Sequence, residues 1–133
     1  MNSNLFSSPL TFLSLPLSQN FGDADVAILG IPFDCGRDAS RFGSRLGPNA
    51  VRHASVLTAN LMNDAKPSPL DSIRVVDAGN VCLPLEDIRL AFDQIEKALG
   101  DILKAGCIPV TVGGDGAVSL PQMRALKKHH GQF

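Results

Sequence analysis

The chain has 133 residues, of which 44% are hydrophobic and 19% charged, a composition typical of one globular domain with a buried core. Twelve Lys and Arg against 13 Asp and Glu give a formal net charge of −1. This balance argues against nucleic acid or an anionic membrane as a partner held by bulk electrostatics. A small cationic substrate stays possible, because it needs only two or three well-placed acids.

The cysteine pattern indicates the cellular compartment of the protein rather than a catalytic or metal-binding role. Cys35, Cys82 and Cys107 are widely spaced and form no CxxC motif. They are expected to be reduced, mostly buried thiols in a cytoplasmic protein. Cys35 is the only one expected in a loop near a site, and no His is placed to activate it as a nucleophile.

The N-terminal segment is apolar between Leu5 and Leu17, but no Lys or Arg precedes it and two prolines interrupt it. This pattern disfavours a secretory signal, and the run is too short to span a bilayer. We therefore expect residues 1–22 to form an extended arm that packs on the domain or on a neighbouring subunit. Residues 23–133 are expected to form the domain itself.

Three β/α units are predicted within that domain. Val26 to Ile31 is a continuous apolar run, typical of a strand buried on both faces. A helix is predicted from Pro48 to Asn60, because proline suits the first helical position and apolar residues then recur at helical spacing. Ile73 to Asp77 is the second strand, and Ala78–Gly79–Asn80 are expected to close it.

The clearest helical pattern in the sequence runs from Leu85 to Ala105, with one apolar stripe and charged residues opposite. Gly106 is predicted to end this helix in the left-handed C-terminal position. Cys107 to Val112 is predicted as a third buried strand, although Pro109 removes one donor from a sheet ladder.

A final helix is predicted after the third strand. Ser119 and Gln122 have the spacing of a capping box at its start. Leu120, Met123 and Leu126 are expected to form its buried face. Strands that alternate with helices predict an α/β fold with right-handed crossovers and a mostly parallel sheet.

Ligands of such sheets bind at the carboxyl ends of the strands. The loops at those ends span residues 33–47, 78–84 and 113–119, so residues of interest should converge on one edge. The first loop is rich in glycine and arginine, which is typical of a functional loop. The alternative is that Arg41 and Arg45 are solvated or pair with Asp34 and Asp38.

The turn Gly113–Gly114–Asp115–Gly116 follows the third strand. Glycines there could let backbone amides approach an anion at a helix start, but the turn lacks the Lys of a P-loop. The plainer alternative is a turn in which glycine is needed for backbone geometry. Asp115 could also hold a metal ligand in place without binding the metal itself.

The histidines offer no metal motif of their own. His53 is predicted on a helix, and His129 and His130 lie in a polar helix end, so surface positions are expected for all three. No HxxxH or DxH pattern occurs. Spacing alone therefore predicts no metal site.

Four ordered segments resemble agmatinase-like members of the arginase family of ureohydrolases. They are TFLSLPLSQNFGDADVAILGIPFDCG, RFGSRLGPNAVRHAS, VVDAGNV and GCIPVTVGGDGAVSLPQMRAL. The resemblance implies a three-layer α/β/α fold around a parallel sheet, of which this chain carries an incomplete N-terminal part, in trimers or hexamers. It also implies hydrolysis of agmatine-like guanidino substrates to urea and an amine by water activated on two metals, usually Mn²⁺.

Two departures from the family pattern concern the metals. Matching Gly113, Gly114 and Asp115 to the family's Gly-Gly-Asp-His motif puts Gly116 where that motif has a metal-binding His. The remaining ligands belong to later Asp-x-His-x-Asp and Ser-x-Asp-x-Asp motifs, which this sequence does not contain. No metal ligand or catalytic residue can therefore be carried over to this chain. The chain alone is not expected to bind a metal.

Residues that can be carried over support the cleft. Asp115 matches the motif Asp next to the missing ligand. A second set matches the family's Arg-Pro-Gly-Ala-Arg-x-Gly-Pro loop, which shapes the cleft mouth and subunit contacts. This set comprises Arg41, Gly43, Arg45, Gly47 and Pro48, with Phe42 in place of the first Pro.

Three hypotheses about function follow. The first is part of an active guanidino hydrolase that is a homo-oligomer. The second is a catalytically silent subunit, structural or regulatory, which joins a heteromer whose partner carries the metals. The third is a small anion-binding module that uses the Gly113–Gly116 turn. The isolated chain is expected to be oligomeric or poorly soluble, because its sheet edge and apolar arm are uncovered.

Overall fold

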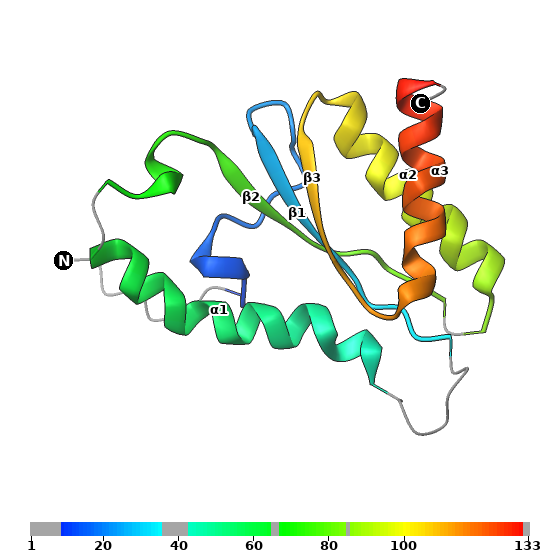
Figure 1. The fold of residues 1–133 in the computed structure, drawn as a ribbon, viewed down its shortest axis with the longest axis horizontal. Helices are drawn as coiled ribbons and strands as arrows, with labels where there is room; N and C mark the ends of the chain where they lie inside the picture. The colour runs from blue at the N-terminus through cyan, green and yellow to red at the C-terminus, as the bar shows by residue number, and fades with distance from the viewer. Residues whose placement is uncertain (1–8, 36–42, 65–66, 85, 132–133) are drawn as a thin grey trace.

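The computed structural model describes residues 9–35, 43–64, 67–84 and 86–131 of the chain. In this part of the chain, three parallel strands form one sheet in the order β2-β1-β3 (Figure 1). They are β1 (Val26–Ile31), β2 (Val75–Asn80) and β3 (Ile108–Gly113). The central strand β1 is buried from Ala27 to Ile31, as its unbroken apolar run predicts.

Helices cover both faces of the sheet (Figure 1). The helix α1 (Gly47–Asp64) lies on one face, and α2 (Ile88–Lys104) and α3 (Ser119–His130) lie on the other. The chain crosses from β1 to β2 in one direction and from β2 to β3 in the opposite direction. Right-handed crossovers then require opposite faces. This is the predicted α/β/α arrangement, built here on an incomplete sheet.

Short 3-10 turns join these elements. They are η1 (Phe12–Ser14), η2 (Ser44–Leu46), η3 (Pro69–Asp71) and η4 (Gly116–Val118). Among the described residues, no helix combines the length and apolar character needed to cross a membrane.

The core lies between the sheet and α2. Ile31, Ile95, Leu99 and Ile102 are fully buried there. Asp87 caps the start of α2 by accepting a hydrogen bond from the Leu90 amide. The helix ends before Gly106, whose φ of +75° confirms the predicted left-handed position.

The second strand both begins and ends later than predicted, at Val75 instead of Ile73 and at Asn80 instead of Asp77. Ala78, Gly79 and Asn80 do not close β2 but belong to it, because Gly79 and Asn80 pair with Leu29 and Gly30 of β1 after a bulge. The bulge shifts the register between Ile28 and Leu29, and Gly79 has a φ of +81°. A glycine in a strand thus marks an irregular ladder here rather than the end of the strand.

Pro109 is compatible with the third strand, because β3 is an edge strand in the described sheet. The amide of Ile108 donates to the Asp25 carbonyl on the β1 side. Backbone groups of successive strand residues point in opposite directions, so the Pro109 nitrogen faces the open edge. No ladder hydrogen bond is lost, and proline is confined to the place where sheets tolerate it.

The predictions for α3 were partly wrong. Its N-cap is Val118 without a side-chain hydrogen bond, and Gln122 binds the Thr111 hydroxyl and the Val118 carbonyl instead of forming a capping box. Leu120 and Met123 are about half exposed, whereas the buried residues of α3 are Pro121 and Ala125. The helix packs mainly on α2, and Leu126 is partly buried against the core, as predicted.

The described part of the arm, residues 9–22, lies against β2 and α1. Its backbone forms a parallel bridge between Leu17 and Asp77 beside β2. The Asp77 amide donates to the Pro16 carbonyl at 2.9 Å, and the Ser18 amide donates to the Asp77 carbonyl at 3.0 Å. The arm therefore supplies β2 with hydrogen-bond partners on the side away from β1.

All three cysteines are free thiols, as expected, but they are not mostly buried. Cys107 is buried, and burial raises the pKa of its thiol. Cys35 and Cys82 are exposed, because both follow the ends of strands in loops at the sheet edge.

Candidate functional site

The strand order places a crevice between β1 and β3. The chain leaves β1 towards α1 on one face and leaves β3 towards α3 on the other (Figure 1). Loops that diverge from adjacent parallel strands open a crevice at the carboxyl ends, and this is where ligands of α/β sheets bind. Ile31 of β1 and Gly113 of β3 are partners in the register, so the crevice begins directly after them.

A clamp at Asp115 joins the two loops. The Asp115 amide donates to the Phe33 carbonyl at 3.1 Å, and Asp115 Oδ2 accepts from the Cys35 amide at 2.8 Å. Asp115 Oδ1 accepts from the Ala117 amide at 2.9 Å and so caps η4. Both carboxylate oxygens are thus used to hold backbone in place.

The ionisation of Asp115 is favoured by this clamp. Burial opposes the charge, but the hydrogen bonds from Cys35 and Ala117 outweigh it and hold the pKa of Asp115 below its ordinary value. The nearby Asp34 acts in the opposite direction without reversing the shift. Asp115 is therefore an anion whose partners are chiefly backbone amides.

Glycines make the close approach of the loops possible. A Cβ on Gly114 would lie 1.8 Å from the Phe33 carbonyl oxygen, which no real side chain permits. A Cβ on Gly47 would lie 3.1 Å from the Gly113 carbonyl oxygen, so the start of α1 also packs against the end of β3. Gly114 is therefore a requirement of backbone geometry, as the plainer interpretation of the turn proposes.

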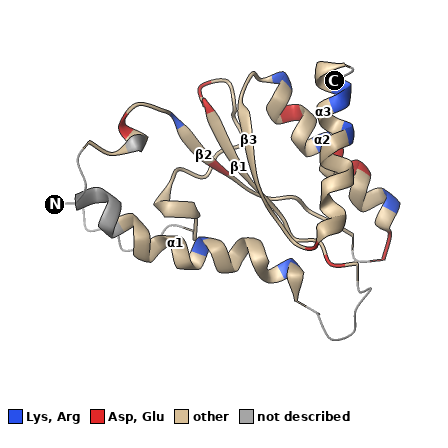
Figure 2. Ribbon diagram, viewed as in Figure 1, with Lys and Arg blue, Asp and Glu red and all other residues tan. Residues whose placement is uncertain are grey.

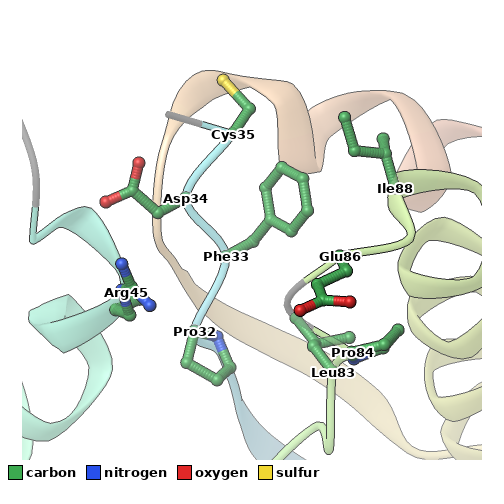
Figure 3. A pocket seen from close by; sticks show the side chains of 9 residues that line it. All are labelled: Pro32, Phe33, Asp34, Cys35, Arg45, Leu83, Pro84, Glu86 and Ile88. Atoms are coloured by element: carbon green, nitrogen blue, oxygen red, sulfur yellow. The ribbon is translucent and has the colours of Figure 1, made fainter. Parts of the chain in front are cut away.

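A pocket of about 290 Å³ opens beside the clamp (Figure 3). Figure 3 shows Asp34 and Arg45 on one side and Glu86 on the other, with the Phe33 ring between them. The Phe33 ring also packs on Phe92 of α2 at a centroid distance of 5.5 Å. The lining residues are Pro32, Phe33, Asp34, Cys35, Arg45, Leu83, Pro84, Glu86 and Ile88.

The predicted loop residues are only partly brought together. Arg45 lies in η2 on the pocket rim, and Gly43 precedes it with a φ of +117°. The Gly43 amide donates to Asp34 Oδ2 at 2.8 Å, which ties the rim to the end of β1. Arg41 and Asp38 lie outside the described residues. The pocket is thus flanked by carboxylates of Asp34 and Glu86 and by one guanidinium.

A buried polar network at the end of β2 was not singled out from the sequence. Arg52 Nε and Nη2 donate to the two carboxylate oxygens of Asp77 at 2.7 and 2.8 Å, and both side chains are buried. Arg52 also donates to Asn80 Oδ1 at 2.5 Å and to the Gly79 carbonyl at 2.9 Å. The available signal was an Asp at the predicted end of the strand, with an Arg on the preceding predicted helix.

The same network holds the arm. The Phe12 amide donates to Asp77 Oδ2 at 2.7 Å, and the Leu13 amide donates to the Ser55 hydroxyl at 2.8 Å. Burial opposes the charge of Asp77, but hydrogen bonds from Arg52, Phe12 and Gly79 outweigh it and lower its pKa. One buried ion pair therefore connects the arm, α1 and the carboxyl end of β2.

The histidines are where the sequence predicted them. His53, His129 and His130 are exposed, and the rings of His129 and His130 contact each other edge to face at 4.6 Å. They lie on α1 and at the end of α3, and none of them lines the pocket beside the clamp.

Comparisons with known proteins agree on one family. Residues 24–133 match the model of the arginase family. Over 121 residues the chain is 35% identical to a mitochondrial guanidino acid hydrolase of Rattus norvegicus, covering 91% of this chain but only 34% of that protein. A crystal structure of a hypothetical agmatinase from Burkholderia thailandensis superposes with a TM-score of 0.84 at 28% identity, covering 96% of this chain and 40% of that chain.

Manganese occurs in a further similar structure, a formiminoglutamase from Trypanosoma cruzi with Mn²⁺. Its TM-score is 0.69 at 27% identity, and 90% of this chain and 42% of that chain are covered. The described residues of this chain do not fit such a metal. They contain no group of three or more His, Cys, Asp or Glu side chains that could hold an ion. Both carboxylate oxygens of Asp115 accept hydrogen bonds from backbone amides, and Gly116 has no side chain.

Proposed function

Because this chain belongs to the arginase family, we propose that it forms the cleft-bearing N-terminal part of a hydrolase that converts guanidino compounds to urea and an amine. The observation that carries the proposal is the pocket lined by the loops that follow β1 and β2, flanked by charged side chains and adjoining the Asp115 clamp. The chain spans about a third of the rat relative, so the reaction of the whole protein is part of the proposal.

The proposed substrate is an agmatine-like guanidino compound. A guanidinium or ammonium cation suits the carboxylates of Asp34 and Glu86, and a carboxylate tail suits the planar donors of Arg45. The pocket therefore has groups for either end of a charged guanidino substrate. Within this chain, Phe33 and Leu83 would shield the substrate from water, and Asp115 would keep the two loops at a constant separation.

The metal belongs to the proposal for the whole protein only. Two Mn²⁺ ions, if held by the rest of the whole protein, would supply an activated water for hydrolysis. The proposed role of the described residues of this chain is to bind and orient the substrate, not to hold the metal.

A second function is favoured by one observation, namely the absence of a side chain at Gly116. A catalytically silent subunit would keep the fold and the pocket while a partner chain carries the metals. Such a subunit would work inside a heteromer rather than as a hydrolase in its own right.

A chimera tests both functions. In it, this chain replaces the matching 121 residues of the rat guanidino acid hydrolase, with and without Gly116→His. We expect urea release from guanidino acids or agmatine by the chimera, slower with Gly116 than with the substitution. Urea release only after Gly116→His favours the silent subunit. A folded chimera that releases no urea in either form contradicts the hydrolase.

Arg45→Met in the same chimera tests which class of guanidino substrate the pocket recognises. Loss of the guanidinium should raise KM for a guanidino acid and leave KM for agmatine nearly unchanged, because only the acid carries a carboxylate. Arg74→Met is the matched control, since Arg74 is exposed at the other end of the sheet and pairs with Asp25. Equal changes of KM for both substrates would remove Arg45 from substrate recognition.

We also propose a homo-oligomer, a trimer or hexamer, in the cytoplasm. Figure 2 shows few charged residues along the described part of α1. On this helix Leu57 and Val51 are 73% and 40% exposed, and Leu46, directly before it in η2, is 64% exposed. Large exposed apolar side chains on one helix are typical of an interface. Light scattering of the purified chain tests this, and a monomer at all concentrations would contradict it.

A further inference from the structure

The glycines of the turn after β3 differ in what the fold demands of them. A Cβ on Gly113 would lie 2.9 Å from Val118 Cγ2, and a Cβ on Gly114 would lie 1.8 Å from the Phe33 carbonyl oxygen. A Cβ on Gly116 would meet no atom of the described chain within 4 Å. Steric demand therefore explains the glycine at 114 but not the glycine at 116.

Backbone conformation does not explain Gly116 either. Positive φ values occur at other glycines of the described chain, and Gly116 is not among them. It is the first residue of η4, which Asp115 caps. Glycine is a poor residue for such a position because it loses the most conformational freedom on folding. An L-residue at this position would be both accommodated and favoured.

No neighbouring group takes over the role of a side chain at 116. Asp115 precedes it, but its two oxygens accept hydrogen bonds from the Cys35 and Ala117 amides. These two hydrogen bonds hold the Asp115 carboxylate against the backbone of the β1 loop and the start of η4. The backbone of the turn is thus held in place, while position 116, which could carry a metal-binding side chain, has none.

We infer that Gly116 is a vacant side-chain position on an intact scaffold, and that the turn of this chain contributes no ligand to a metal. The inference rests on membership of the arginase family and on the geometry of the turn, and not on the proposed guanidino substrate. It disagrees with the Mn²⁺ site that the family implies at this edge of the sheet.

The first experiment uses the chain itself and compares Gly116→Ala with Gly114→Ala by thermal unfolding. Gly116→Ala should leave the melting temperature unchanged or raise it, because the position is open and helical. Gly114→Ala should lower it by several degrees, because a methyl group cannot share space with the Phe33 backbone. Equal destabilisation by the two substitutions would overturn the inference, since Gly116 would then be required by the fold.

The second experiment measures manganese. The wild-type chain should leave the electron paramagnetic resonance signal of free Mn²⁺ unchanged at equimolar protein. A signal lost with the wild-type chain and restored by Asp115→Asn would overturn the inference, because the turn would then bind the ion through Asp115.

The third experiment counts Mn²⁺ per chain in the rat chimera by elemental analysis. Gly116→His should raise the bound Mn²⁺, because an imidazole joins ligands that the rest of the chimera supplies. Gly116→Ala is the matched control and should not raise it. If the chimera with Gly116 already binds as much Mn²⁺ as the Gly116→His variant, the metal site lacks no ligand at position 116 and the inference fails.

These readouts separate the inference from the proposed function. A gain of Mn²⁺ without urea release leaves the vacant position standing and contradicts the hydrolase. Urea release at full rate by a Gly116 form that holds its metals supports the hydrolase and overturns the vacant position.

Discussion

The two edges of the described sheet are treated in opposite ways. At the β2 edge, the arm adds a backbone partner through Pro16, Leu17 and Ser18 around Asp77. At the β3 edge, Ile108 and Val110 are 63% and 46% exposed, and no strand of the described chain pairs there. The β2 edge is closed by the N-terminal arm and a buried ion pair, whereas the β3 edge presents apolar side chains.

The difference shows what kind of contact each edge is built for. Closing the β2 edge uses polar groups that are all satisfied inside this chain, because Asp77 accepts from Arg52, Phe12 and Gly79. The β3 edge offers Ile108 and Val110 on one face and Pro109 and Thr111 on the other. Its apolar residues require a partner that the described residues do not provide.

The largest expected effect comes from breaking the closed edge at its centre. Asp77→Ala leaves the Arg52 guanidinium buried without its carboxylate and removes the acceptor of the Phe12 amide. Loss of one partner of a buried ion pair typically costs about 3–5 kcal/mol of unfolding free energy. Urea denaturation measures this loss.

Asp25→Ala is the matched control for the loss of an aspartate–arginine pair. Asp25 and Arg74 are exposed at the opposite end of β1, so the loss should be much smaller. Equal losses for the two variants would show that the Asp77 pair does not hold the closed edge.

Acid should open the closed edge before it disturbs the core. The pKa of Asp77 is lowered below its ordinary value of 3.8, so the folded state favours the ionised carboxylate. Its contribution to stability is fully present above that ordinary value and is lost as the pH falls through the lower, folded-state pKa. Asp115 contributes in the same direction at the clamp.

Melting temperature against pH tests this expectation. The wild-type chain should lose stability in acid below the ordinary carboxyl pKa, and Asp77→Asn should show a shallower loss over the same range. An identical acid profile in both would mean that Asp77 does not control the acid stability.

A smaller effect is expected from the second anchor of the arm. Ser55→Ala removes the acceptor of the Leu13 amide and a hydroxyl that donates to the Arg52 carbonyl. One unmade hydrogen bond of this kind costs about 1 kcal/mol. Hydrogen exchange at the Leu13 amide should accelerate, whereas Thr58→Ala on the exposed side of α1 should change neither stability nor exchange. Unchanged exchange in Ser55→Ala would mean that the arm is held elsewhere.

The smallest effect on stability and the clearest effect on association are expected at the open edge. Val110→Lys places a charge on an exposed apolar strand, a device that natural sheets use to prevent edge pairing. Unfolding free energy should change by no more than about 0.5 kcal/mol. Light scattering should show less self-association than in the wild type.

Ala105→Lys is the control for the added charge, at an exposed position after α2. It should leave association unchanged. Self-association that persists in Val110→Lys would locate the contact on another surface, such as α1.

Much of the fold follows from local patterns. The continuous apolar run of β1, the stripe of α2 and Gly106 at its end predict elements that the structure confirms. Local patterns were misleading where the environment decides. Ala78–Gly79–Asn80 were predicted to close the strand, but Gly79 and Asn80 pair with β1 after a bulge. Ser119 with Gln122 matches a capping box but caps nothing.

The candidate site divides in the same way. The turn at Asp115 and the loop with Gly43 and Arg45 could be named from the sequence, because glycine and charge cluster after predicted strands. The buried pair of Arg52 and Asp77 could not, because a charged residue on a helix and one at a strand end are ordinarily solvated. Only packing of the arm over them removes that water.

Sequence by itself determined the alternation of strands and helices, the parallel sheet and the likeness to the arginase family, because hydrophobic periodicity and motif order are local properties of the chain. Tertiary structure alone decided which sheet edge is closed, which oxygens of Asp115 are occupied and which glycine of the turn is required. These depend on distances between segments far apart in the chain, such as 1.8 Å at Gly114 and open space at Gly116. No local pattern records such distances.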